Sequence, residues 1–353
     1  MRFTHRTHDQ RVHFGTGSAA AAVAEAAAAL GSRRVFVIAS AREIARTGEV
    51  LAGVPVAARW DEVVMHVPES LAVRARRAAA DVGADLLLSI GGGSATGLAK
   101  AVALTSGIPI VAVPTTFAGS EATPVWGLTD DSGKTTGIDD RVLPRAIVYD
   151  AALTASLPVA ACIASGLNAL AHCVGSLWAP RADPVNRALA TEGMTALDSG
   201  LRDIAERPDG VAGREQTLYA TYLAGVAFAS AGSGLHHKIA HVLGGAYNLP
   251  HASLHAALLP YVTAFNAAAD PDADVRIGAA LGAPDAVTGL AALYAAVGAP
   301  TALRDLGFAE SGVDAAAAAV ARVIPPGNPR EATVDDLRAL LLAACRGELK
   351  GRP

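Results

Sequence analysis

Apolar segments with two different periods alternate along the first 150 residues, and this alternation constrains the fold more than any other feature of the sequence. Short continuous apolar runs are typical of buried strands, whereas longer segments with apolar residues at helical spacing indicate helices. We expect strands at 33–40, 60–67, 84–90, 108–115 and 145–150, and helices at 18–30, 70–82 and 94–106. Continuous apolar strands separated by helices predict a parallel sheet that is covered on both faces.

Strand-like runs stop near residue 155, and the rest of the chain has only helical periodicity. Helices are expected at 155–179, 181–206, 214–230, 255–268, 286–297, 312–322 and 333–346. The chain has 353 residues, which is more than one typical domain contains. The sequence therefore predicts an α/β domain over 1–154, followed by an all-helical domain over 155–353.

Composition excludes several classes of function. Hydrophobic residues make up 52% of the chain, charged residues make up 18%, and the net charge is −4, so no basic surface for nucleic acid is expected. Three cysteines do not form a disulfide framework and fit a reducing compartment. The N-terminus has no apolar leader, and no long apolar run lacks Gly, Pro or charge. We expect a cytoplasmic protein that binds neither nucleic acid nor membrane.

Three consecutive glycines separate a predicted strand from a predicted helix in "LLLSIGGGSATGLAKAV" (86–102). Gly91, Gly92 and Gly93 let the main chain approach a ligand closely, and Ser94 is a candidate helix cap. A helix N-terminus at the carboxyl end of a strand attracts anions. The spacing differs from the G-x-G-x-x-G fingerprint, and a tight turn that binds nothing is the alternative. Because three glycines exceed what a turn requires, we interpret the segment as a phosphate site.

Hydroxyl side chains follow two other predicted strands. Thr115, Thr116 and Ser120 follow the strand at 108–115 and are candidates to bind the pyrophosphate, ribose or nicotinamide of a dinucleotide. A capped turn is the alternative. Ser40 ends the strand at 33–40, where a carboxylate would hold a ribose 2′-hydroxyl and repel a 2′-phosphate. Since Ser40 does neither and Arg42 is nearby, the choice between NADH and NADPH stays open.

Polar residues recur at helical spacing in the apolar second half. Asn168 and His172 are four residues apart in "SGLNALAHCV" (165–174), as are His237 and His241 in "GLHHKIAHVLGGAYNLPH" (234–251). His251 follows a Leu-Pro turn that can fold it back. One histidine on an apolar helix is usually a core residue. Five such polar residues in one apolar domain indicate a shared site.

Three histidines and a carboxylate would suit Fe²⁺ or Zn²⁺. The fourth position here is Asn168, whose neutral amide is a weaker ligand and leaves the charge of the cation uncompensated. We therefore expect no tightly bound metal. Without one, the histidines, helped by His255 and Lys238, form a cationic or hydrogen-bond-donating pocket that suits an anionic substrate.

Four segments resemble a known family: "GADLLLSIGGGSATGLAK", "VPTTFAGSE", "ASGLNALAHCV" and "GLHHKIAHVLGGAYNLPHA". In this order they resemble the iron-containing alcohol dehydrogenase superfamily and, within it, the maleylacetate reductases. The resemblance extends from "HFGTG" to "NPREATVDDLRALLLAA". It implies a dinucleotide-binding domain over 1–154, a substrate and catalytic domain over 155–353, and an active site in the cleft between them. It also implies a homodimer.

The resemblance also assigns the metal-ligand positions of the metal-dependent branch. They correspond to Asn168, His172, His237 and His251, with His241 as a further active-site residue. Three departures from the metal-dependent pattern are similar to the maleylacetate reductase branch, which works without a bound metal. The ligand Asp is missing, the loop at 113–124 is one residue shorter than in alcohol dehydrogenases, and Gly97 replaces an Asp. Gly175 also stands where an acidic residue is expected.

The activity that the resemblance implies is reduction of maleylacetate, a small dicarboxylate, to 3-oxoadipate with NADH or NADPH during aromatic-compound degradation. Hydride addition to a double bond conjugated to a carbonyl gives an enolate, which hydrogen-bond donors stabilise without a Lewis acid. His241 and His237 would polarise the substrate and donate a proton, and His172, His251 and Asn168 would complete the set. The implied cofactor contacts are pyrophosphate at Gly91, Gly92, Gly93 and Ser94, the nicotinamide half at Thr115, Thr116 and Ser120, and its ribose at Lys134.

Three other functions fit parts of the pattern. The first is a metal-dependent alcohol or aldehyde oxidoreductase of the same fold. The second is a non-catalytic NAD(P)-binding protein, which the histidines disfavour. The third is a lyase of the dehydroquinate synthase type, which would need a firm zinc site that Asn168 disfavours.

Overall fold

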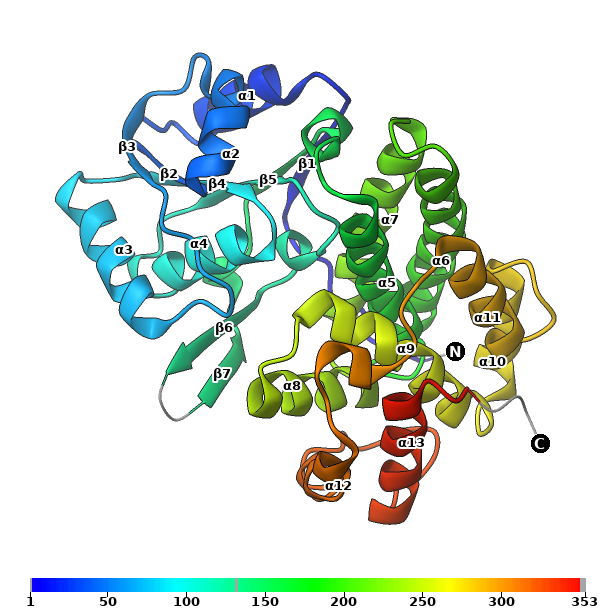
Figure 1. Ribbon diagram of the computed structural model, residues 1–353. Coiled ribbons are helices and arrows are strands. Elements are labelled where there is room, and N and C mark those ends of the chain that lie inside the picture. The colour runs from blue at the N-terminus through cyan, green and yellow to red at the C-terminus, as the bar shows by residue number, and fades with distance from the viewer. Residues whose placement is uncertain (1, 131–132, 350–353) are drawn as a thin grey trace. The chain divides into compact units, whose positions relative to one another are not determined.

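The computed structural model describes residues 2–130 and 133–349, without the side chain of Lys134. The chain forms two compact units, which are described separately (Figure 1). The first unit is Thr7–Leu157, and the second combines the residues up to Arg6 with those from Pro158 onward. The N-terminal residues group with the second unit because His5 Nδ1 contacts Asp183 Oδ2 at 2.9 Å.

A six-stranded parallel sheet forms the centre of the first unit (Figure 1). Its strands stand in the order β1-β8-β5-β4-β2-β3. Their bounds are β1 Arg11–Phe14, β2 Val35–Ile38, β3 Val56–Trp60, β4 Leu86–Gly91, β5 Ile110–Pro114 and β8 Ala146–Tyr149. Every residue of β2, β4, β5 and β8 is buried, because both faces of a parallel sheet are covered.

Two pairs of helices cover the two faces of this sheet. Helix α1 (Ala19–Ala29) packs on the face that includes Val37 and Leu88, and Ile44 of α2 (Ala41–Arg46) joins the same core. Helices α3 (Glu69–Asp81) and α4 (Gly93–Ser106) pack on the opposite face against Phe36 and Leu87. The predicted α/β fold class is confirmed.

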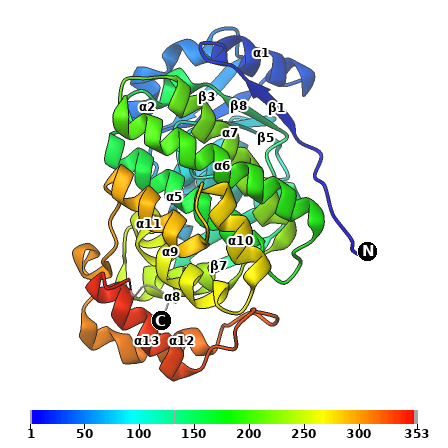
Figure 2. The ribbon, with the colours of Figure 1, turned by 90° about the vertical axis from the view of Figure 1, so that its right-hand side faces the viewer.

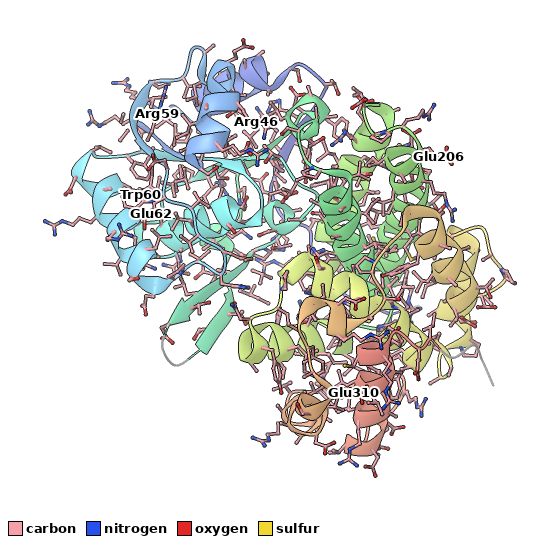
Figure 3. All side chains as sticks on the ribbon, viewed as in Figure 1. Arg46, Arg59, Trp60, Glu62, Glu206 and Glu310 are labelled. Atoms are coloured by element: carbon pink, nitrogen blue, oxygen red, sulfur yellow. The ribbon has the colours of Figure 1, made fainter. Side chains whose placement is uncertain are left out.

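The strand predicted at 60–67 is wrong. The observed strand β3 ends at Trp60, whose indole Nε1 donates to the carbonyl of Glu62 at 2.8 Å; both residues are labelled in Figure 3. His66 and Val67 have φ of 65° and 47°, which is incompatible with an extended strand. The apolar run of this segment thus reflects the packing of Val67 against the α3–α4 layer.

Besides the misplaced β3, three strands are missing from the sequence prediction. Strand β1 is only four residues long, and its burial is partial, so its apolar signal is weak. Strands β6 (Val125–Asp130) and β7 (Gly133–Ile138) form an antiparallel hairpin outside the main sheet. The hairpin carries few buried apolar side chains, so it lacks the pattern by which the other strands are recognised.

The described residues of the second unit contain helices and no strands (Figures 1 and 2). The helices are α5 Val159–Ser176, α6 Pro184–Glu206, α7 Ala212–Ala231, α8 Leu235–Tyr247, α9 His251–Ala267, α10 Pro271–Ala280, α11 Ala286–Val297, α12 Val313–Ala321 and α13 Val334–Arg346. Helix α10 was not predicted. The all-helical character predicted for this part of the chain is confirmed.

The residues at their N-caps explain why two helices begin later than predicted. Pro158 is the N-cap of α5, so the helix begins at Val159 rather than at 155. Helix α6 begins at Pro184 rather than at 181, because Asp183 Oδ1 accepts from the amides of Val185 and Asn186 at 2.8 and 2.9 Å.

Helix α5 is long and apolar enough to cross a membrane by length and composition alone, but 83% of it is buried inside the molecule. It is a core helix of the second unit, and it contacts α6, α7 and α9. Helices α8 and α9 share a further apolar core with α12 and α13, which includes Leu243, Leu258 and Leu341. This core fixes the relative positions of α8 and α9, which carry most of the histidines discussed below.

Glycines let the main chains of α6 and α7 approach closely. A Cβ added at Gly200 of α6 would lie 2.6 Å from Thr217 Oγ1 and 2.9 Å from the carbonyl oxygen of Gly213, both on α7. The backbone atom cannot rotate away. Only glycine therefore fits at this helix contact without moving a helix.

Gly200→Ala is expected to lower the free energy of unfolding by about 1–3 kcal/mol, because the added methyl group overpacks this contact. Gly245→Ala is the matched control, since Gly245 is on α8 with no atom within 4 Å of its added Cβ. The control should leave stability unchanged or raise it by about 0.5–1 kcal/mol. Urea denaturation of both variants measures the difference, and equal effects would contradict the close approach.

Candidate active site

The glycine run lies where the sheet reverses its winding direction. Strands β2 and β4 are neighbours, but α2 follows β2 onto one face and α4 follows β4 onto the other. The carboxyl ends of strands at such a switch point are where open α/β sheets bind ligands. Gly91 ends β4, Gly92 is the N-cap of α4, and Gly93 is its first residue.

The geometry of the glycine run explains why glycine occupies it. Gly91 has φ of +144°, a conformation that other residues rarely adopt. A Cβ at Gly92 would lie 2.9 Å from Thr116 Cγ2. No side chain caps α4, so its first amides are not occupied by a cap. The prediction that Ser94 caps the helix is wrong, because the helix begins one residue earlier and Ser94 lies in its first turn.

The second polar loop lies against the glycine run. The amide of Thr115 donates to the carbonyl of Gly91 at 3.1 Å, which extends the pairing of β4 with β5. The side chain of Thr116 faces Gly92, and a Cβ at Gly93 would be 3.6 Å from that of Ala118. Ser120 begins a short 3₁₀ helix, Ser120–Ala122. The structure therefore brings Thr115 and Thr116 next to the glycines. The side chain of Lys134 lies outside the described residues.

The first turn of α2, directly after β2, contains an acidic residue that was not predicted as a site residue. Ser40 Oγ accepts from the amide of Glu43 at 3.3 Å and so caps α2. The Cγ of Glu43 lies 4.0 Å from the Cβ position of Gly91. Its Oε2 is buried without a hydrogen-bond partner among the described residues, and Oε1 is 3.5 Å from Arg46 Nη1. Arg42 is exposed. The signal that could have found Glu43 is that it is the first carboxylate after the strand.

The predicted histidines of the second unit form one cluster, centred on His237 of α8. The rings of His172 (α5) and His237 are stacked with centroids 4.9 Å apart, and His241 (α8) is 6.4 Å from His237. Helix α9 begins at His251, so the Leu-Pro turn does fold this residue back. Asn168 is buried one turn before His172 on α5.

Two histidines join this cluster beyond the predicted set. From the sequence, His255 was predicted only as an auxiliary group, and His236 was not predicted as a site residue. His255 lies between His251 and His237, at 4.5 and 4.8 Å between ring centroids. His236 Nε2 and His255 Nδ1 share a hydrogen bond of 2.9 Å. The "HH" pair and the i, i+4 spacing of His251 and His255 were the available signals.

Comparisons with known proteins identify the family of the chain, with one family model matching in each unit. The model of iron-containing alcohol dehydrogenases matches residues 9–151, and the model of the C-terminal part of Fe-containing alcohol dehydrogenases matches residues 162–345. The chain belongs to the iron-containing alcohol dehydrogenase family. The predicted resemblance is therefore confirmed.

Within this iron-containing alcohol dehydrogenase family, the chain is similar to maleylacetate reductases. It is 46% identical to maleylacetate reductase 2 of Cupriavidus pinatubonensis, covering 96% of this chain and 95% of the relative. A solved maleylacetate reductase from Agrobacterium tumefaciens is 36% identical with a TM-score of 0.93, covering 98% of this chain and 99% of that one. A structure described as an iron-containing alcohol dehydrogenase from Corynebacterium glutamicum is 52% identical with a TM-score of 0.95. The match covers 98% of this chain and 97% of that one.

The name of the iron-containing alcohol dehydrogenase family raises the question of whether the histidine cluster fits an iron ion. Among the described residues, no three His, Cys, Asp or Glu side chains are placed to hold a metal. The stacked rings of His172 and His237 differ by only 13°, so their lone pairs lie in nearly parallel planes and do not point at one ion. Asn168 stands where the resemblance places a carboxylate. The residues as arranged do not fit a tightly held metal.

Burial keeps four imidazoles of the cluster neutral, those of His172, His236, His237 and His255. It lowers the pKa of His172 to about 4 and that of His236 to about 3, with nearby histidines adding to the shift. Burial and then the neighbouring rings also hold the pKa values of His237 and His255 well below the ordinary value. Both ring nitrogens of His237, and one each of His172, His236 and His255, have no hydrogen-bond partner among the described residues. These buried nitrogens are available to a ligand.

The free energy of unfolding is expected to fall as the pH drops below about 6.5, where histidines of the unfolded chain gain protons. The four buried histidines stay neutral in the folded chain until the pH approaches their lowered pKa values, so the unfolded chain binds more protons. Each of these histidines contributes up to about 1.4 kcal/mol per pH unit to the slope of the free energy of unfolding against pH. Urea denaturation between pH 7 and 5 measures it. His172→Phe should reduce the slope, and a flat profile in the unsubstituted protein would contradict the neutral cluster.

Proposed function

We propose that this protein reduces the carbon–carbon double bond of maleylacetate to give 3-oxoadipate, with NADH or NADPH as the reductant. The observation that carries the proposal is the 46% identity to a maleylacetate reductase over nearly the full length of both chains. Asn168 at the position of the ligand carboxylate supports it, because this substitution disfavours a metal-dependent reaction. The protein is thus an oxidoreductase of the iron-containing alcohol dehydrogenase family.

The first unit supplies a surface that suits the dinucleotide. The glycine run and the uncapped N-terminus of α4 fit a pyrophosphate, since main-chain amides and the helix dipole favour an anion there. Gly91, Gly92, Gly93 and Ser94 would contact it. The hydroxyls of Thr115, Thr116 and Ser120 would hold the nicotinamide half, with Lys134 at its ribose. Ser40 supports this surface indirectly by capping α2.

The chemistry of the substrate matches what the histidine cluster can do. When bound, the nicotinamide cofactor supplies a hydride to the double bond, and one proton is added at the neighbouring carbon. The chain must then hold two carboxylates, stabilise charge on the carbonyl oxygen and deliver that proton. Neutral imidazoles donate hydrogen bonds, and donors in a dry site stabilise developing negative charge well. Both ring nitrogens of His237 lack a hydrogen-bond partner among the described residues and can therefore bind a substrate. His241 is only partly buried and so accessible to a substrate.

A second candidate function is oxidation or reduction of a simple alcohol or aldehyde with a bound metal. It is favoured by the 52% identity to the structure described as an iron-containing alcohol dehydrogenase. An unactivated alcohol benefits from a Lewis acid, whereas a double bond conjugated to a carbonyl is already electrophilic. The placement of the histidines therefore favours maleylacetate. The cytoplasmic location and the homodimer stay predictions.

The assay that separates these functions follows NADH and NADPH absorbance with maleylacetate, and NAD⁺ or NADP⁺ reduction with short alcohols. We expect rapid oxidation of reduced cofactor with maleylacetate and formation of 3-oxoadipate. Turnover with alcohols but not with maleylacetate would support the second function. Cofactor binding without either reaction would identify a non-catalytic binding protein.

Replacing the central histidines should lower kcat/KM for maleylacetate. His237→Ala and His241→Ala each remove a donor of the cluster, and a positioned proton donor contributes about 10²–10⁴-fold. Steady-state kinetics at fixed NADH measures the loss, and Tm checks that the variants fold. His5→Ala is a control that removes a histidine outside the cluster. Full kcat/KM in both cluster variants would make the assigned roles wrong.

Glu43 should favour NADH over NADPH. Its carboxylate adjoins Gly91 at the switch point, where a negative charge repels a 2′-phosphate and accepts from a ribose hydroxyl. Glu43→Gln should raise the ratio of kcat/KM for NADPH to that for NADH by about tenfold, equivalent to about 1.4 kcal/mol. Glu49→Gln is the matched control on an exposed residue nearby. An unchanged ratio in Glu43→Gln would exclude this residue as the determinant.

A further inference from the structure

Lys100 is a completely buried lysine in the first unit. It is 0% exposed and lies on α4, two turns after the glycine run. Lysine is almost never fully buried unless its ammonium group is paired. Here Nζ donates to the carbonyl oxygens of Ser120, Thr123 and Val125 at 2.7, 2.7 and 2.8 Å. The hydroxyl Oγ1 of Thr123 is a longer fourth contact at 3.2 Å, and this hydroxyl itself donates to the carbonyl of Ser120. All three carbonyls belong to the segment that leads from the second polar loop into β6.

The three carbonyl acceptors indicate which protonation state of Lys100 the loop requires. An ammonium group has three N–H donors and no acceptor, so it satisfies three carbonyl oxygens. A neutral amine has only two donors and would face one carbonyl with its lone pair. Burial lowers the pKa of Lys100 to about 7, and the negative charge of Glu121 opposes this shift. The three carbonyls further stabilise the charged form.

Other buried groups hold the same segment from different sides. Glu121 Oε1 accepts from the hydroxyl of Tyr149 on β8 at 2.8 Å, and the Glu121 carbonyl accepts from Gln10 Nε2 at 2.9 Å. At its other end, the loop contacts the glycine run through Thr116 and Gly92. Lys100 thus ties the loop to the helix whose N-terminus carries the glycine run.

We propose that Lys100 is a positioning residue for the dinucleotide: its ammonium group holds the loop from Ser120 to Val125 in register with the glycine run before the cofactor binds. This inference rests on the proposed function, because it assumes that both loops contact NADH or NADPH. Lys100 touches neither cofactor nor substrate in this account. It acts by removing the entropic cost of ordering the loop during binding.

The test compares NADH dissociation constants, measured by fluorescence titration, with Tm in the full-length protein. Lys100→Met keeps the length of the side chain and removes the donors. Lys100→Met/Glu121→Gln also removes the carboxylate charge left without its cation, while the amide oxygen still accepts from Tyr149. Glu121→Gln alone tests the charge, and Arg77→Met is a control that removes an exposed cation of α3.

We expect both Lys100→Met variants to raise the Kd for NADH by about tenfold, and Arg77→Met to leave it unchanged. The double variant should recover part of the Tm lost in the single variant, because it leaves no unpaired buried charge, but should not recover the Kd. If the double variant recovered the Kd together with the Tm, Lys100 would only stabilise the fold, and the proposal would be overturned. An unchanged Kd in folded Lys100→Met would also overturn the proposal. Absence of NADH binding by the unsubstituted protein would instead overturn the proposed function.

Hydrogen exchange of the unsubstituted protein tests the same proposal if the Lys100→Met variants do not fold. A loop that is ordered in advance should show slow amide exchange over 120–125 without NADH, and adding NADH should change it little. Rapid exchange that becomes slow only with NADH would contradict a loop held by Lys100.

Discussion

Burial of the parallel sheet on both faces is the constraint from which the proposed cofactor surface of the first unit follows. Because α2 and α4 leave neighbouring strands toward opposite faces, the ends of β2 and β4 form a switch point at which ligands bind. The glycines there let the second loop come within contact distance, and Lys100 ties that loop to α4 from inside. One arrangement of helices thus brings together the proposed phosphate site and the two residues, Glu43 and Lys100, to which we assign cofactor specificity and positioning.

Burial also determines the chemistry of the second unit. The imidazoles of His172, His236, His237 and His255 are neutral because burial disfavours their charged form and the neighbouring histidines disfavour it further. Their stacked geometry does not direct lone pairs at one ion, and Asn168 adds no negative charge to hold one. A site of this kind suits an anionic substrate that is already electrophilic. It suits an unactivated alcohol less well, since that reaction draws on a Lewis acid.

The sequence predicted the features that depend on apolar periodicity or on a spacing along one helix. Strands β4 and β5 are largely apolar runs, and His172 of α5 does meet His237 and His241 of α8 in one cluster. Features that depend on tertiary contacts were missed. In the sequence, nothing separates Lys100 from other helix residues, because the carbonyls that surround it belong to a distant segment. Glu43 becomes a candidate site residue only because the fold places it beside Gly91. The hairpin β6–β7 was missed because it buries little apolar surface.

The central claim is that the histidine cluster acts on maleylacetate without a metal. Its most direct test is the NADH-dependent turnover of maleylacetate by protein whose metal content has been determined, before and after treatment with a strong chelator. We expect far less than one iron or zinc ion per chain and the same kcat/KM after chelation. Stoichiometric metal, with turnover that is lost on chelation and restored by Fe²⁺ or Zn²⁺, would contradict it.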